Sequence, residues 1–177
     1  MAVPNNRRTI LTKRILKETL IELMQNKPIT KITIKEICEM ADLSRSTFYL
    51  HYTDQFALLE DIENEVLHKT FDYLTEMNTE TDSVASIEIF LDYVKSNRST
   101  FGILLCQPEN TAFQQNVTKA LFSYLQNLVP SLKDGKQDSY LYTFMIHGSI
   151  HVIIDWIGRN FDVPAHDLAK LIFQACV

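Results

Sequence analysis

Two short helices separated by a turn of about three residues constrain the fold of this chain more than any other feature of its sequence. Thr33 precedes the first helix and Glu36 follows three residues later, which is the spacing of a capping box. Ser44 is an N-cap for the second helix. It comes just after Asp42, a residue type that tolerates the left-handed conformation. The pattern predicts one helix over residues 34–40 and another that starts after Ser44.

The flanking segments complete a three-helix bundle. Apolar residues recur with a period of 3.6 over residues 9–26, starting at Ile10 and Leu11, and predict an amphipathic helix there. A fourth helix, capped by Thr53 or Asp54, is expected to run to about residue 77 with an apolar stripe that begins at Phe56. This order of helices is typical of a helix-turn-helix. Its expected core comprises Leu16, Leu20, Leu23, Ile34, Ile37, Ala41, Leu43 and Phe48.

The stretch SRSTFYLHY, residues 44–52, separates into two faces when it is read as a helix. Phe48 and Tyr52 are four residues apart and belong to the core face. The other face carries no carboxylate, and each of its side chains can donate a hydrogen bond to a phosphate or a base edge. These outward residues are Arg45, Ser46, Thr47, Tyr49 and His51.

The distribution of charge supports a polyanionic partner for the first part of the chain. The net charge is −5, but residues 1–53 hold nine Lys/Arg against five Asp/Glu, a net charge of +4, so the remainder carries −9. Attraction to phosphates depends on local charge, so one basic face is sufficient. Arg7 and Arg8 precede the first predicted helix, either as a solvated tail or as an arm that enters the minor groove.

Composition and periodicity predict an all-α fold of about nine helices in two domains, residues 1–53 and 54–177. Only four glycines and five prolines are present, too few for the turns of an all-β fold. A polar boundary, NTETDS, occupies residues 78–83. We expect a cytoplasmic protein with no membrane partner, because no apolar run approaches the roughly 18 residues that span a bilayer. The C-terminal helices are expected over residues 84–96, 98–106, 110–129, 136–160 and 164–177.

Residues 9–59 resemble the DNA-binding domain of the TetR/AcrR family of bacterial transcriptional regulators. The resemblance is carried by ITKITIKEICEMADLSRSTFYLHYTDQFALL, with its threonine-rich lead-in, its turn before Ser and its Thr-aromatic-Tyr helix. The chain departs from the family pattern at Asp42, where Gly is frequent, and at Gln55, where a phosphate-binding Lys is usual.

The resemblance implies roles for individual residues. It implies that Arg45, Ser46 and Thr47 face major-groove bases and that Tyr49 and His51 hold phosphates. It also implies that Lys35 reaches a base or a phosphate and that Thr33 bonds a phosphate.

The resemblance also implies a homodimer on a palindromic double-stranded operator, with a small-molecule effector that releases a repressor. The alternative is an activator or co-activator that acts through a protein partner.

The C-terminal half, YLYTFMIHGSIHVIIDWIGRNFDVPAHDLAKLI at residues 140–172, resembles a C-terminal domain common among Firmicutes members of that family. Such members include the activator of dihydroxyacetone kinase genes as well as repressors. Candidate effector-binding residues in this half are Tyr93, Phe101, Phe144, His147, His151 and Trp156.

One stripe of polar residues recurs every four positions, at His147, His151 and Asp155. Such a stripe can supply metal ligands, contacts of a dimer interface, or polar contacts in a cavity. We expect no metal and no cofactor, because HxxxH lacks the neighbouring Glu of zinc proteases. Nor do we expect an enzyme, since neither a nucleophile-base pair nor a glycine-rich phosphate loop is present. The three cysteines are far apart, and we expect them to be buried and reduced.

Overall fold

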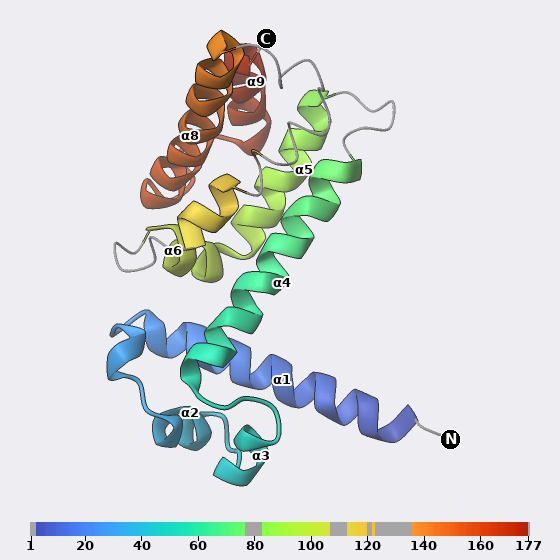
Figure 1. Ribbon diagram of the computed structural model, residues 1–177, viewed down its shortest axis with the longest axis vertical. Helices are drawn as coiled ribbons and strands as arrows, with labels where there is room; N and C mark the ends of the chain where they lie inside the picture. The colour runs from blue at the N-terminus through green and yellow to red at the C-terminus, as the bar shows by residue number, and fades with distance from the viewer. Residues whose placement is uncertain (1–2, 77–82, 107–112, 120–121, 123–135, 177) are drawn as a thin grey trace. The chain divides into compact units, whose positions relative to one another are not determined.

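The structure of this chain is a computed structural model. Every regular element in its described part is helical (Figure 1), which confirms the predicted all-α fold. The structure describes residues 3–76, 83–106, 113–119, 122 and 136–176. The chain forms two compact units, Met1–Val66 and Leu67–Val177.

The first unit is a small helical bundle in which α1 packs on α2 and α2 on α3. Leu16, Leu20, Ile37 and Phe48 are each 0% exposed, as predicted. The other expected core residues, at 23, 34, 41 and 43, are half-buried because they lie at the edge of this core. The elements are α1 (Val3–Met24), a 3-10 helix η1 (Ile29–Lys31), α2 (Ile34–Met40), α3 (Arg45–Tyr49) and the first part of α4 (Gln55–Glu76).

Three expectations for α1 and α4 are corrected by the structure. Helix α1 begins at Val3 and ends at Met24, instead of covering residues 9–26. Ile10 and Leu11 are 61% and 47% exposed although the periodicity placed them in the core stripe. The first residue of α1 that the structure shows as buried is Thr12, so the preceding turns have no core to cover. Phe56, in the first turn of α4, is likewise 49% exposed.

The predicted caps of the helix-turn-helix are confirmed. Thr33 and Glu36 form a reciprocal capping box on α2, and the side chain of Ser44 accepts the Thr47 backbone N–H at the start of α3. Asp42 adopts a φ of 52° in the turn between the two helices. Asp54 is the cap of α4, because its carboxylate accepts the backbone N–H of Ala57 at 2.8 Å. Short local patterns therefore set the geometry of this motif.

The second unit contains α5 (Ser83–Ser96), α6 (Arg98–Cys106), α8 (Lys136–Gly158) and α9 (Ala165–Cys176), which agree with the predicted helices. Helix α5 packs along α9 and α6 along α8 (Figure 1). Residues 113–119 are also helical, whereas most of the helix predicted over 110–129 and the polar boundary at 78–82 lie outside the described residues. The core of this unit includes Leu91, Val94, Leu104, Ile146, Trp156, Leu168 and Ala169.

A tight turn joins α8 to α9. Asn160 and Phe161 both have positive φ, 56° and 61°, a conformation that is costly for a bulky residue. Trp156 stabilises this turn by two contacts. Its Nε1–H donates to the Val163 carbonyl at 2.8 Å, and its ring packs edge to face on Phe161 with 4.8 Å between the ring centres. The buried tryptophan therefore has a structural role at the end of α8.

In the described residues, no helix is long and apolar enough to cross a bilayer. Cys38 is a buried free thiol, as expected, and Cys106 is a half-buried one. Burial raises the pKa of both thiols, so both stay protonated.

Candidate nucleic-acid interface

Helix α3 is only five residues long, and its geometry depends on the cap that precedes it. The hydroxyl of Ser44 accepts the Thr47 N–H at 3.1 Å and lies 2.7 Å from the Ser46 hydroxyl and 2.8 Å from the Thr47 hydroxyl. Three hydroxyl groups therefore meet at the start of the helix. They remain able to exchange partners with an incoming base or phosphate oxygen, because each hydroxyl both donates and accepts.

The two faces predicted for residues 44–52 are present. Phe48 is 0% exposed and Tyr52 6%, so both belong to the core. Arg45 and Ser46 are exposed, and Tyr49 is 58% exposed. Thr47 and His51 are half-buried. The structure therefore brings all five outward residues together around one short helix.

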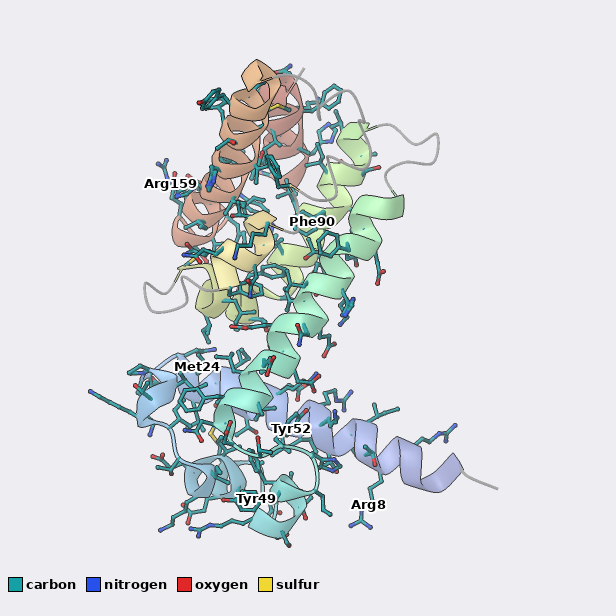
Figure 2. The ribbon with its side chains drawn as sticks, viewed as in Figure 1. Arg8, Met24, Tyr49, Tyr52, Phe90 and Arg159 are labelled. Carbon is teal, nitrogen blue, oxygen red and sulfur yellow. The ribbon has the colours of Figure 1, made fainter. Side chains whose placement is uncertain are left out.

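A polar cluster on the core side joins the end of α3 to α1 and α4. The Tyr52 hydroxyl donates to Asp61 Oδ2 at 2.7 Å, and Lys17 Nζ lies 3.0 Å from the same oxygen and 2.8 Å from Glu65 Oε2. Lys13 Nζ is 5.2 Å from the centre of the Tyr52 ring and 3.5 Å from Asp61. Tyr52 thus lies between α1 and α4 (Figure 2), and its contacts with Lys13 and Asp61 connect the end of α3 to both helices.

This cluster shifts the pKa values of its members in opposite directions. Burial raises the pKa of Tyr52 and the hydrogen bond to Asp61 raises it further. Burial also acts to raise the pKa of Asp61, but the hydrogen bonds from Tyr52 and Lys17 and the two lysine charges outweigh it and lower that pKa. Tyr52 is therefore a neutral donor and Asp61 an ionised acceptor.

The residues of α2 implied in phosphate binding already have partners. The backbone N–H and the hydroxyl of Thr33 both contact Glu36 Oε2, at 2.9 and 2.8 Å. Lys35 is exposed and 3.7 Å from Glu39. The hydrogen bond from Lys27, followed by those from Thr33, lowers the pKa of Glu36 to about 2. A phosphate at Thr33 would therefore have to displace a carboxylate that is charged at neutral pH.

Two of the six candidate effector residues lie in an aromatic cluster. The rings of Tyr93 and Phe101 meet edge to face at 5.5 Å, and Tyr73 lies 5.0 Å from Tyr93. Phe101 is 3% exposed and Tyr93 half-buried. These three rings therefore pack against one another within the second unit.

The other four candidates lie on α8, where they do not form one site. Trp156 is buried at the turn to α9. Phe144 is 69% exposed, and His147 and His151 are exposed. The rings of the two histidines are 6.5 Å apart, and His151 Nδ1 lies 2.8 Å from the His147 carbonyl. The exposure of this stripe favours an interface over a cavity.

The third member of the stripe, Asp155, forms an ion pair with Arg159 at 2.8 Å. Among the described residues, no group of three or more His, Cys, Asp or Glu is arranged to hold a metal ion.

The polar cluster around Asp61 was not predicted from the sequence. Its lysines are 44 or 48 residues from their carboxylate partners along the chain, so no local spacing relates them. The only available signal was the tyrosine hydroxyl at a position read as apolar core, because a buried hydroxyl needs a partner.

Comparison with known proteins places this arrangement in a family. A family model described as "Transcriptional regulator C-terminal region", of the TetR type, matches residues 82–176, more than half of the chain. The chain belongs to the TetR family. A relative from Bacillus subtilis (strain 168), the HTH-type transcriptional regulator YxbF, is 32% identical over 172 residues. The match covers 90% of this chain but 43% of YxbF, so the chain spans less than half the length of that relative.

Solved structures share the fold of this TetR-family chain. A TetR transcriptional regulator from Streptococcus agalactiae 2603V has a TM-score of 0.69 at 21% identity, covering 99% of both chains. NalD, a secondary repressor of a multidrug efflux pump in Pseudomonas aeruginosa, has a TM-score of 0.65 at 17% identity over 93% and 96%.

DhaS, a dihydroxyacetone kinase operon activator, has a TM-score of 0.58 at 17% identity over 94% of both chains. At these identities the likeness shows the fold alone, so a repressor and an activator share it equally. Membership of a family of transcriptional regulators agrees with the expectation that the chain is not an enzyme.

Proposed function

We propose that this chain is a dimeric regulator that binds a palindromic double-stranded DNA operator through α3. The observation that carries the proposal is that Arg45, Ser46 and Tyr49 are exposed on a short helix held rigidly by its cap, by Phe48 and by the Tyr52 cluster. A rigid helix that offers donors to a major groove is the requirement of sequence reading. Such a regulator works where the chromosome lies, in the cytoplasm.

The proposed contacts divide between bases and backbone. Arg45, Ser46 and Thr47 read base edges, with Arg45 suited to a bidentate contact with guanine. Tyr49 and His51 hold phosphates and thereby set the position of α3. Thr33 and Lys35 of α2 are the outer phosphate contacts. Their present partners, Glu36 and Glu39, make these two contacts weaker than those of α3.

The proposed dimer forms through α8 and α9. Tyr140, Leu141 and Phe144 are 78%, 54% and 69% exposed along α8, and Leu171 of α9 is 55% exposed. These apolar side chains gather on two helices that pack against each other. Exposed apolar clusters of this kind mark an association surface. Two-fold pairing would double the bases that are read and explains why the operator should be a palindrome.

The proposed effector is a small molecule that binds the second unit, where Tyr93 and Phe101 offer an aromatic wall. An effector changes operator affinity only by binding the two conformations of the protein with different affinity. We propose repression as the outcome, because a dimer that covers an operator blocks transcription until the effector releases it.

Selection from a random duplex library with the wild-type protein, followed by binding measurements at one salt concentration, tests the DNA-binding function. We expect Arg45→Ala and Tyr49→Ala to abolish binding to the selected operator while the dimer stays folded. Arg159→Ala, an exposed arginine of the second unit, is the matched control and should bind normally. Unchanged binding by both α3 variants would sink the proposal.

A further inference from the structure

Most basic side chains of the first unit are neutralised within that unit. The ion pairs join Lys13 and Lys17 to Asp61, Lys17 to Glu65, Arg14 to Glu18, Lys27 to Glu36 and Lys35 to Glu39. Among the described residues, Arg7, Arg8, Lys31 and Arg45 make no ion pair. Arg45 is the proposed base-reading residue, so the remaining unpaired cations are candidates for further phosphate contacts.

Arg7 and Arg8 are held on a helix, because α1 begins at Val3. Both side chains are exposed. Arg8 lies one turn before Thr12 on the face of α1 that is buried from Thr12 onward. Its side chain is therefore at the edge of the bundle. The expectation of a solvated tail or an extended arm is therefore wrong for these two residues. A helical segment offers charges at a defined position but cannot thread into a minor groove as an extended arm does.

The position of these arginines follows from the contact between α1 and the end of α3. Lys13 of α1 lies over the ring of Tyr52, which comes shortly after α3. Arg8 is five residues before Lys13, about 7.5 Å further along the helix axis at 1.5 Å per residue. In Figure 2 the Arg8 side chain points toward the side of the unit on which Tyr49 lies. Arg8 therefore lies about one and a half helical turns beyond the point where α1 meets the end of α3, and Arg7 is its neighbour on the same helix.

We propose that Arg7 and Arg8 form a second DNA contact, which binds backbone phosphates next to those held by Tyr49 and His51. This inference rests on the proposed DNA-binding function. The contact is electrostatic and independent of sequence, because long guanidinium side chains on a helix outside the groove meet phosphate oxygens before base edges. It extends the footprint of each protomer beyond the bases that α3 reads.

Salt titration on two duplexes tests the inference. One duplex is trimmed to the sequence that the wild-type protein selects, and the other carries extra base pairs on both sides. We expect Arg7→Gln/Arg8→Gln to lower the slope of log K against log salt by about one for each arginine that contacts a phosphate. Affinity should fall by the same factor on operator and on scrambled duplex, and only the longer duplex should show the full effect.

Arg14→Gln provides the matched control, because it removes the same charge from the same helix. Arg14 is exposed but already paired with Glu18, and it lies six residues, about 9 Å, further along the helix than Arg8 at 1.5 Å per residue. We expect its salt slope to equal that of the wild type. An unchanged slope for Arg7→Gln/Arg8→Gln, or a change only in its oligomeric state, overturns this inference alone. A wild-type protein that selects no sequence overturns the proposed function, and this inference with it.

Discussion

The two units of this chain leave apolar side chains in water in different ways. In the first unit they are spread over several helices, as with Ile10 of α1, Met40 of α2 and Phe56 of α4. In the second unit Tyr140 and Phe144 lie one turn apart on α8. Scattered apolar residues are normal on a protein surface, whereas a cluster indicates a partner. The cluster on α8 is therefore the surface on which we propose that a second copy binds.

The largest expected effect is on the stability of the core of the first unit. Phe48→Ala removes a ring that is 0% exposed and leaves a cavity in the core of the small bundle. We expect a loss of about 3–5 kcal/mol in the free energy of unfolding, because the cavity cannot collapse around the missing ring. Denaturant unfolding followed by circular dichroism would measure it. A loss below about 1 kcal/mol, the level of a typical surface change, would show that this core is not what holds α3.

The next largest effect concerns the apolar cluster of the second unit. Phe144→Asp places a charge on the proposed dimer face and should raise the dissociation constant of the dimer by about 30-fold, or about 2 kcal/mol. Sedimentation equilibrium measures this constant directly. Ile89→Asp, at a side chain 53% exposed on α5, is the control and should leave the dimer intact. Equal effects of the two variants would remove the distinction between clustered and scattered apolar residues.

A smaller effect is expected at the cap of α3. Ser44→Ala removes the acceptor of the Thr47 N–H and should cost about 1 kcal/mol of stability, typical of an N-cap. Ser44→Asp keeps an acceptor and should restore stability while it adds a negative charge near the proposed DNA face. Thermal unfolding of the two variants separates the cap from the charge. Equal stability of all three proteins would contradict the role given to this cap.

The smallest effect is a dependence on pH. The pKa of Glu36 is lowered to about 2 in the folded chain, so its carboxylate stabilises the fold above its unfolded pKa of about 4.3. That contribution is lost as the pH falls through the folded value. We expect the difference in Tm between the wild type and Glu36→Gln to shrink as the pH falls from about 5 to about 2. A difference that stays constant over this range would show that Lys27 and Thr33 do not hold the charged form.

Local patterns in the sequence predicted the helix-turn-helix closely, because caps act within four residues. Thr33, Ser44 and Asp42 have the predicted conformations. The division of the α3 stretch into two faces also followed from periodicity, since Phe48 and Tyr52 are buried. Local signals were sufficient for this part of the molecule.

Features that depend on distant partners could not be predicted. Ile10 and Leu11 have the spacing of core residues, but burial requires a neighbour, and the bundle ends at Thr12. The pairing of Lys17 with Asp61 and Glu65 likewise depends on how α1 meets α4. The two carboxylates lie outside residues 1–53, so they offset part of the net charge of +4 that the sequence assigns to that segment.

The polar cluster of Tyr52, Asp61 and Lys17 at the end of α3 determines how the orientation of this helix depends on pH. The pKa of Tyr52 is raised and that of Asp61 is lowered, so the two protonation equilibria are moved away from neutrality in opposite directions. Neither group changes its charge near neutral pH, so the hydrogen bond between them is kept there. The orientation of α3 is therefore expected to be insensitive to changes of pH around neutrality.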